Sequence, residues 1–318
     1  MKSRLVYVLF LTILFCCITS YIVYFGFVSN YSHRMFSRPA FIDLYGKGIF
    51  HYRVLSRNLL LGLDDLIDPS GKQFYQTTFY FNTFFLVLSG IVTVLLFHLR
   101  RVFRLSEGEK ILFILLIPLI INITQFVVVP YDTLGYFFQL LITYIFLAFY
   151  EKEFAFATLS ISLLLIVSTL NRESSAINLS FLITLLLFVY GWNRRTIRTS
   201  AAFILSFLVT YVLLRVVIGE APPSGPNALI GHLGIFVNQV GIAFWLVTAA
   251  FVHLLANDRR NRRLLLCFYL LSTPYIFLVL KDGILWEIRL YIPLFLGSLL
   301  LSKLDLTAAS ATDRSTEG

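Results

Sequence analysis

Acidic, basic and aromatic side chains that can carry chemistry are concentrated in a few short segments between long apolar runs. Carboxylates can act as a general base on an acceptor hydroxyl, and arginine binds phosphate oxygens with paired hydrogen bonds. A phosphosugar on a lipid carrier would need both kinds of group where acyl chains meet water. The segments are residues 41–48 with 51–57, then 129–135, 169–175 and 281–289.

The predicted catalytic residues are the three carboxylates Asp43, Asp132 and Glu173. Asp43 precedes a run of apolar residues at helical spacing. Asp132 follows Pro130 in a predicted tight turn between two apolar spans, and the alternative interpretation is that it caps the next helix. Glu173 and Arg172 interrupt two apolar runs. They are either a structural ion pair or part of a site, because ionisable groups at membrane depth usually mark a site.

A second group of residues is expected to bind the substrate. Glu287 and Arg289 stand at the entrance to the last apolar span, where unpaired charges are costly. Arg215, near the end of another span, and His232, in a loop, are weaker candidates. The predicted substrate-binding residues are Arg53, Tyr131, Arg172, Glu287 and Arg289.

The composition indicates a protein embedded in a membrane. Of the 318 residues, 58% are hydrophobic and only 14% are charged, whereas soluble domains have roughly 45–50% apolar and about 25% charged residues. Runs of about 18 or more apolar residues recur, and each can cross a hydrocarbon core roughly 30 Å thick. The predicted spans are residues 5–27, 78–97, 111–129, 134–150, 154–170, 176–190, 201–218, 238–256, 264–280 and 290–303.

The predicted fold class is all-α, a polytopic transmembrane helix bundle of about ten spans, because lipid offers no hydrogen-bond partner to backbone amides. Residues 1–304 are expected to form a single transmembrane domain. Its first outer loop, residues 28–77, is expected to contain interfacial helices, since residues 49–67 have amphipathic helical spacing. Residues 305–318 are expected to be a disordered cytoplasmic tail.

The distribution of basic residues predicts the orientation. Sixteen of the 26 Lys and Arg residues fall in loops on one side of the predicted spans and nine on the other. Because cytoplasmic loops carry the excess, both termini are predicted to be cytoplasmic. These loops account for the net charge of +9, and nucleic acid is not an expected partner, since no basic face with interleaved aromatic residues lies outside the spans. The predicted location is a bacterial inner (plasma) membrane.

Several short patterns resemble those of the membrane glycosyltransferases of the GT-C superfamily and their bacterial relatives. Those enzymes have an inside N-terminus, a long first outer loop with a catalytic Asp, and a second acidic site in the next outer loop. The chain differs in two ways, because Asp43 has no acidic neighbour and no outer soluble domain follows. The residues that carry the resemblance are Asp43, Asp132, 52–55, 171–173, 287–289 and Pro293.

The resemblance implies a polyprenyl-phosphate-linked sugar donor, an acceptor on the outer surface and inversion at the anomeric carbon. Asp43 would deprotonate or orient the acceptor, while Arg172 and Arg289 would hold the donor phosphate. Asp132 or Glu173 would orient the acceptor or its partners. The acceptor would be a glycan, a lipid or a protein, and the other partners would be membrane lipids.

Other functions stay open at this point. A polysaccharide polymerase or ligase of the outer face has a similar number of spans and outer arginines. A lipid or solute transporter is disfavoured because the ionisable residues lie at span ends rather than at mid-membrane, and an assembly subunit is a further alternative. No cofactor is predicted. The sequence has no cluster of metal ligands or nucleotide-binding loop, and it leaves open whether a divalent metal is needed.

Overall fold

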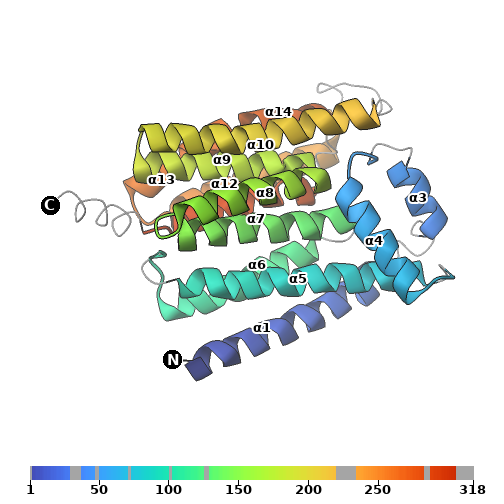
Figure 1. Cartoon of the computed structure of the whole chain (residues 1–318). Helices are drawn as coiled ribbons and strands as arrows, with labels where there is room; N and C mark the ends of the chain where they lie inside the picture. Colours follow the sequence, from blue (N-terminus) through green and yellow to red (C-terminus); the bar gives the residue numbers. More distant parts are fainter. Residues whose placement is uncertain are drawn as a thin grey trace.

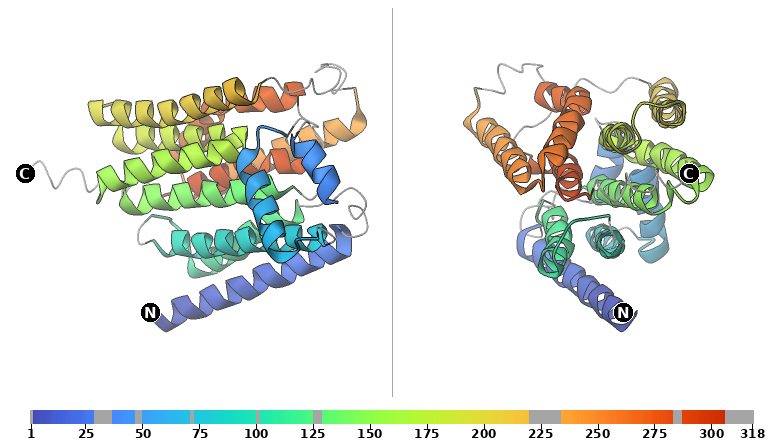
Figure 2. Two further views of the ribbon diagram at one scale, coloured as in Figure 1. Left: turned by 45° about the vertical axis from the view of Figure 1, so that its right-hand side comes forward. Right: turned by 90° about the vertical axis from the view of Figure 1, so that its left-hand side faces the viewer.

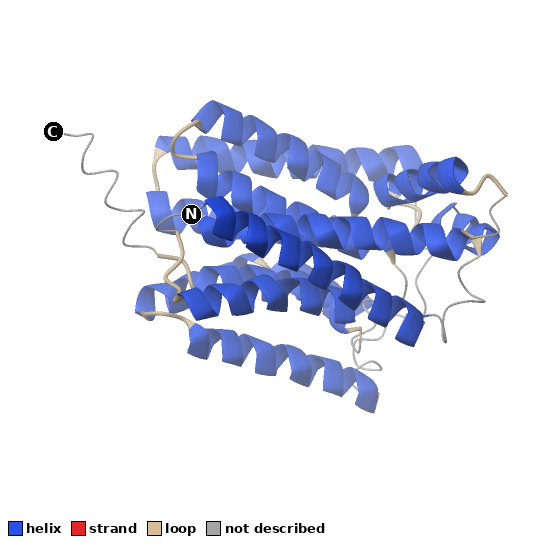
Figure 3. Ribbon diagram, turned by 90° about the horizontal axis from the view of Figure 1, so that it is seen from below, coloured by secondary structure: helices blue, strands red, loops and turns tan. Residues whose placement is uncertain are grey.

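The computed structural model describes residues 2–28, 37–46, 50–70, 73–99, 102–124, 129–219, 234–282 and 287–305. Throughout these residues the chain forms helices joined by short turns, without a named strand (Figure 3). The predicted all-α class is therefore confirmed. Of the predicted tail only Asp305 is described, and His232 lies outside the described residues.

Figure 1 shows the helices in their order along the chain. A π-helical turn, Tyr24–Val28, continues the first helix, and a 3-10 turn, Glu173–Ser175, and a π-helical turn, Leu186–Tyr190, flank α9. The α-helices are α1 (Lys2–Val23), α3 (Arg38–Gly46), α4 (Val54–Ile67), α5 (Phe74–His98), α6 (Glu107–Ile123), α7 (Pro130–Phe149), α8 (Phe154–Asn171), α9 (Ala176–Leu185), α10 (Arg194–Ile218), α12 (Phe236–Leu255), α13 (Arg259–Leu271), α14 (Thr273–Asp282) and α15 (Ile292–Ser302).

Seven helical segments of the described chain are long and apolar enough to cross a membrane. An eighth is added if α13 and α14, which are bent by 54° at their junction, count as one span. α6 has 17 residues and begins with charged residues, and α15 has only 11 residues. The structure is consistent with a multi-pass membrane protein, and the count of about ten spans stays a prediction.

α5 and α7 lie at the centre of the bundle, and α1, α10 and α12 lie at its outside (Figure 2). In the most apolar stretch of α7, 56% of the residues are buried, against only 11% in α10. Because α10 and α12 expose long rows of Leu, Val and Phe, these surfaces suit contact with lipid rather than with water.

Contacts between distant segments define one end of the bundle, here called the basic end. Arg4 pairs with Glu107 at 3.1 Å and Lys303 with Glu109 at 3.4 Å. The Arg260 guanidinium donates to the Phe188 carbonyl at 3.1 Å. α9 and the turn that follows it run from residue 176 to this end, so the 171–175 break lies at the opposite end of the bundle from the 259–263 cluster.

α3 and α4 lie at the end opposite the basic end, and α4 runs across the direction of the other helices (Figures 1 and 2). The helix expected at 49–67 begins only at Val54, because the chain turns at Arg53, whose amide donates to the Phe50 carbonyl. The expected tight turn at residues 130–133 is wrong. Pro130 opens α7 instead, since proline fits the first helical position.

Candidate functional site

Asp132 is the centre of a buried ionic cluster in the first turn of α7. Its side chain is completely buried, and it faces two guanidinium groups from distant segments. The Arg172 Nη1 donates to Oδ1, and the Arg289 Nη1 donates to Oδ2 at 3.0 Å. The α7 N-cap, Val129, makes no side-chain cap bond, and the Asp132 carboxylate binds these two arginines. The alternative that it is a helix cap is therefore not what the structure shows.

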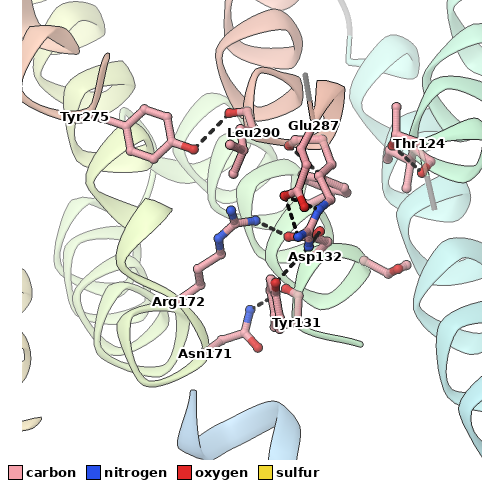
Figure 4. A network of polar contacts seen from close by, with 12 residues as sticks. Thr124, Tyr131, Asp132, Asn171, Arg172, Tyr275, Glu287 and Leu290 are labelled. Carbon is pink, nitrogen blue, oxygen red and sulfur yellow. Dashed lines mark hydrogen bonds and ion pairs between the residues drawn. The ribbon is translucent and has the colours of Figure 1, made fainter. Parts of the chain in front are cut away.

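Arg172 reaches Asp132 because the chain breaks between α8 and α9. At Arg172 the backbone is extended, with φ −166° and ψ 145°, and a 3-10 turn follows. The preceding Asn171 fixes the break by donating from Nδ2 to the Tyr131 carbonyl at 2.8 Å. Figure 4 shows Asn171, Arg172, Tyr131 and Asp132 converging from these segments. Glu173, the next residue, forms no pair with Arg172 and faces another partner.

Arg289 enters the cluster from the 3-10 turn before α15. Its Nε and Nη2 donate to Glu287 Oε2 at 3.0 and 2.6 Å, and its Nη1 donates to the Tyr131 hydroxyl at 2.7 Å. Tyr136 holds the same turn by donating to the Arg289 carbonyl at 3.0 Å. Burial alone would lower the pKa of the Arg289 guanidinium, but Tyr131, Asp132 and Glu287 beside it together raise that pKa, so the group stays charged.

The Tyr131 ring is stacked against Arg53. The Arg53 guanidinium carbon lies 3.6 Å from the centre of the Tyr131 ring and 4.3 Å from that of Phe50. Arg172 and Arg289 also lie near the Tyr131 ring, at 5.1 and 5.8 Å. Three guanidinium groups therefore surround one tyrosine, an arrangement in which the face of an aromatic ring stabilises cations.

The cluster contains more positive than negative charge. Asp132 and Glu287 neutralise Arg172 and Arg289 through the ion pairs given above. Arg53 has no ion pair among the described residues, and its Nη1 is buried without a hydrogen-bond partner. Because a buried donor without a hydrogen-bond partner is costly, an anionic ligand that accepts from Arg53 Nη1 would be stabilised.

A second ion pair lies beside the cluster. Arg215 donates to Glu173 at 3.3 Å, and its guanidinium carbon lies 3.6 Å from the centre of the Tyr52 ring. The Tyr52 hydroxyl donates to the Gly219 carbonyl at 2.5 Å. Glu173 is about one-third exposed. The segment before α4 is therefore fixed on one side by Tyr131 and on the other by Arg215.

The predicted site residues divide into three groups. Arg53, Tyr131, Asp132, Arg172, Glu287 and Arg289 form one cluster. Glu173 lies beside it in the pair with Arg215. Asp43 is on the exposed face of α3, opposite the buried Phe41 and Tyr45, because a residue two positions from each points to the other side of a helix. The catalytic roles assigned to Asp43, Asp132 and Glu173 stay predictions.

Three further residues support the site. Tyr52 and Asn171 belong to the short patterns that carry the resemblance but were given no role of their own, and Tyr136 was missed in the sequence. Tyr52, Tyr136 and Asn171 hold the cluster through single hydrogen bonds or ring contacts. A structural role for Asn171 could have been predicted, since a buried amide beside a break between two apolar spans is costly without a partner. Tyr136 is one of many tyrosines in apolar surroundings, so no sequence signal distinguishes it.

A small cavity borders the cluster, and a larger groove lies nearby. An enclosed cavity of about 10 Å³, the size of one water molecule, lies among Asp132, Gln139, Asn171 and Asn178. A larger groove of about 530 Å³ lies on the other side of the segment before α4, between α4, α8 and α10. Its walls are mostly apolar, and the side chains of His51 and Arg57 also line it.

Within the described part of the chain, no three His, Cys, Asp or Glu side chains gather closely enough to hold a metal ion. Comparison of the chain with known protein families, with curated proteins and with solved structures gives no match. The site's own geometry is thus the basis for a proposal on function.

Proposed function

We propose that the chain is a membrane glycosyltransferase that moves a sugar from a polyprenyl-phosphate-linked donor to an acceptor on the extracytoplasmic face. The observation that carries this proposal is the convergence of Arg53, Arg172 and Arg289 around Tyr131, with two carboxylates, at one end of an apolar helix bundle. Guanidinium groups at such a rim suit a phosphate whose lipid chain stays in the membrane.

Arg53 is the residue that we assign to the donor phosphate. Arg172 and Arg289 are already paired with Asp132 and Glu287, so a phosphate would have to compete with carboxylates for them. Arg53 has no such pair among the described residues. In this assignment Asp132 acts as a positioning residue, because it fixes two guanidinium groups and offers no free oxygen to a hydroxyl.

In the proposed reaction the acceptor oxygen forms a bond to the anomeric carbon while the bond from that carbon to the phosphate oxygen breaks. Attack opposite the leaving group inverts the anomeric carbon, and the lipid phosphate leaves with the bonding electrons. The hydroxyl proton passes to a carboxylate, as in general base catalysis. Glu173 and Asp43 are the candidates for this base, since both are accessible to solvent.

The proposal includes a topology. The end that carries the cluster faces the extracytoplasmic side of a bacterial plasma membrane, and the basic end with both termini faces the cytoplasm. Each of the ten apolar segments crosses the membrane, and α3 and α4 lie in its outer interface. The exposed Leu59, Leu66 and Ile67 of α4 support this placement, since an interfacial helix buries such residues in the headgroup region.

The test is a transfer assay in proteoliposomes containing a synthetic polyprenyl-phosphate hexose. Release of polyprenyl phosphate reports the reaction whichever acceptor is used, and surface glycans of a host lacking the gene identify that acceptor. We expect Arg53→Gln and Tyr131→Ala to reduce release by at least about tenfold, because each removes part of the phosphate site.

Arg263→Gln, at the basic end, is the matched control and should retain the wild-type rate. Each variant is compared at equal protein level in the membrane. The proposal is abandoned if the wild-type protein releases no polyprenyl phosphate and deletion of the gene changes no surface glycan.

A further inference from the structure

The groove between α4, α8 and α10 has no role in the chemistry proposed above. Its walls include Ile166 and Leu170 of α8 and Leu213, Leu214 and Val217 of α10. Leu213 and Val217 are 55% and 79% exposed, so this wall opens to the same surroundings as the apolar outer face of α10. In a membrane those surroundings are acyl chains, and a lipid-facing groove of about 530 Å³ is filled by one of them.

The residues that line the groove include a cation, Arg57. Arg57 lies in the first turn of α4 and donates from Nη1 to the Tyr45 carbonyl at 3.1 Å and from Nε to Asn58 Oδ1 at 3.1 Å. These two bonds hold the side chain in place and use neutral acceptors. Arg57 has no ion pair among the described residues, so its positive charge is not neutralised by a described carboxylate.

The groove also reaches the N-terminal end of α4, a helix of 14 residues whose Val54 and Arg57 line it. The first turn contains no acidic residue, and the N-cap residue Arg53 makes no side-chain cap bond. Free backbone amides at a helix start favour a negative charge. Arg57 and the N-terminal end of α4 can therefore bind an anion beside the apolar walls of the groove.

We propose that this groove binds one anionic phospholipid of the surrounding bilayer, with an acyl chain between α8 and α10 and its phosphate at Arg57. The single charge of a phosphodiester matches the single guanidinium group that lines the groove. Bilayer phospholipid is also the lipid that a groove open along Leu213 and Val217 meets first. The bound lipid fastens α4 to the bundle and so keeps Arg53 stacked on Tyr131. This site is independent of the glycosyltransferase proposal.

The test is native mass spectrometry of the full-length protein released from nanodiscs that contain equal amounts of phosphatidylglycerol and phosphatidylcholine. We expect one phosphatidylglycerol to be retained by the wild-type protein. Arg57→Gln should reduce the preference for phosphatidylglycerol about fivefold, since one basic side chain near an anionic headgroup contributes about that factor. Leu214→Trp, which fills the groove, should abolish retention.

Two variants serve as matched controls and should retain the lipid as the wild type does. Leu205→Trp changes a lipid-facing leucine of α10 that is 62% exposed and lies outside the groove, and Arg263→Gln removes a cation at the basic end. If Leu214→Trp fails to fold, Val217→Trp on the open wall replaces it.

The proposal is overturned if phosphatidylglycerol and phosphatidylcholine are retained equally, or if Arg57→Gln or the groove-filling variant retains phosphatidylglycerol as the wild type does. It is also overturned if farnesyl phosphate at equimolar concentration displaces the phospholipid, because the groove would then belong to a single-chain lipid phosphate. None of these results depends on sugar transfer, so the two proposals fail separately.

Discussion

Asp132 and Arg289 are 157 residues apart in the chain and form a buried ion pair at 3.0 Å. The pair joins the start of α7 to the turn before α15. Since Asp132 also accepts from Arg172, one carboxylate ties three separate segments together. These ion pairs therefore hold charged residues from distant parts of the chain in one place at one end of the bundle.

The first prediction concerns this carboxylate. Asp132→Asn leaves two buried guanidinium groups without their counter-ion, and breaking a buried pair in this way costs about 3–5 kcal/mol. We expect a large loss of thermal stability in detergent, measured by the unfolding midpoint. Asp43→Asn is the control, because Asp43 is exposed on α3. Equal midpoints for the two variants would contradict the assigned role of Asp132.

The second prediction separates the contributions of the Tyr131 hydroxyl and of the Tyr131 ring to the stability of the protein. Tyr131→Phe removes the hydroxyl that accepts from Arg289 at 2.7 Å and keeps the ring, so it should cost about 1.5–3 kcal/mol for a hydrogen bond to a charged group. Tyr131→Leu also removes the ring beneath Arg53 and should cost about 2 kcal/mol more.

Chemical denaturation of the two Tyr131 variants in the same detergent provides the measurement. If Tyr131→Leu is no less stable than Tyr131→Phe, then the stacking of Arg53 contributes nothing to stability. The control is Tyr80→Phe, since Tyr80 is 49% exposed.

Most of the helices could be predicted from the sequence, because a chain segment inside a membrane has few alternatives to helical structure. Each long apolar run must satisfy its own backbone hydrogen bonds in lipid, so α5, α7, α8 and α10 follow from composition alone. The charged break at Arg172 was predictable for the same reason, since a charge among apolar runs needs a partner. The identity of that partner, Asp132, was not predictable, because it depends on how α7 and α8 pack.

The direction in which Asp43 points could not be predicted from the sequence. Asp43 and Arg53 both lie in the loop expected to carry the site. Neither residue type nor spacing in the sequence indicates which of the two side chains faces the bundle. That choice is made by tertiary packing of Phe41 and Tyr45 against α5 and α7, which turns Asp43 outward. The same packing places Arg53 on Tyr131.

The third prediction tests a close helix contact at the core. A Cβ on Gly297 of α15 would lie 2.8 Å from Phe268 Cζ of α13 and 3.4 Å from Phe181 Cδ2 of α9. Gly297→Ala should therefore destabilise the protein by about 1–3 kcal/mol, as overpacking of a core does. Adding Phe268→Leu should recover part of this loss, because it removes the ring atoms that clash.

Gly108→Ala is the matched control, because a Cβ at Gly108 meets nothing within 4 Å. It should be neutral or slightly stabilising, as expected for glycine replaced by alanine in a helix. If Gly297→Ala is as stable as Gly108→Ala, the contact between α13 and α15 is looser than described.

The fourth prediction tests the orientation in the membrane. In a variant without the three native cysteines, a cysteine at Asp43 should react in intact cells with a membrane-impermeant maleimide. A cysteine at Lys152, in the turn between α7 and α8, should react only after the cells are permeabilised, because the proposed topology places the basic end in the cytoplasm. Labelling of both positions in intact cells, or of Lys152 alone, would contradict the proposed topology.

The last prediction is a pH dependence at the basic end. The backbone amide and the hydroxyl of Ser106 both donate to Glu109 Oε2 at 2.8 Å, and these bonds, with Lys303 nearby, lower the pKa of the Glu109 carboxyl. A lowered folded-state pKa contributes stability above the unfolded value of about 4.3, and this stability is lost as the pH falls through the folded-state pKa. Glu109→Gln should therefore reduce the unfolding midpoint at pH 7, and its difference from the wild type should shrink steadily as the pH falls below about 4.

Ser106→Ala should show the same trend, since it removes the hydroxyl from the capping box at the start of α6. A difference that is constant from pH 7 to pH 3 would mean that the carboxylate form of Glu109 does not stabilise this end of the bundle.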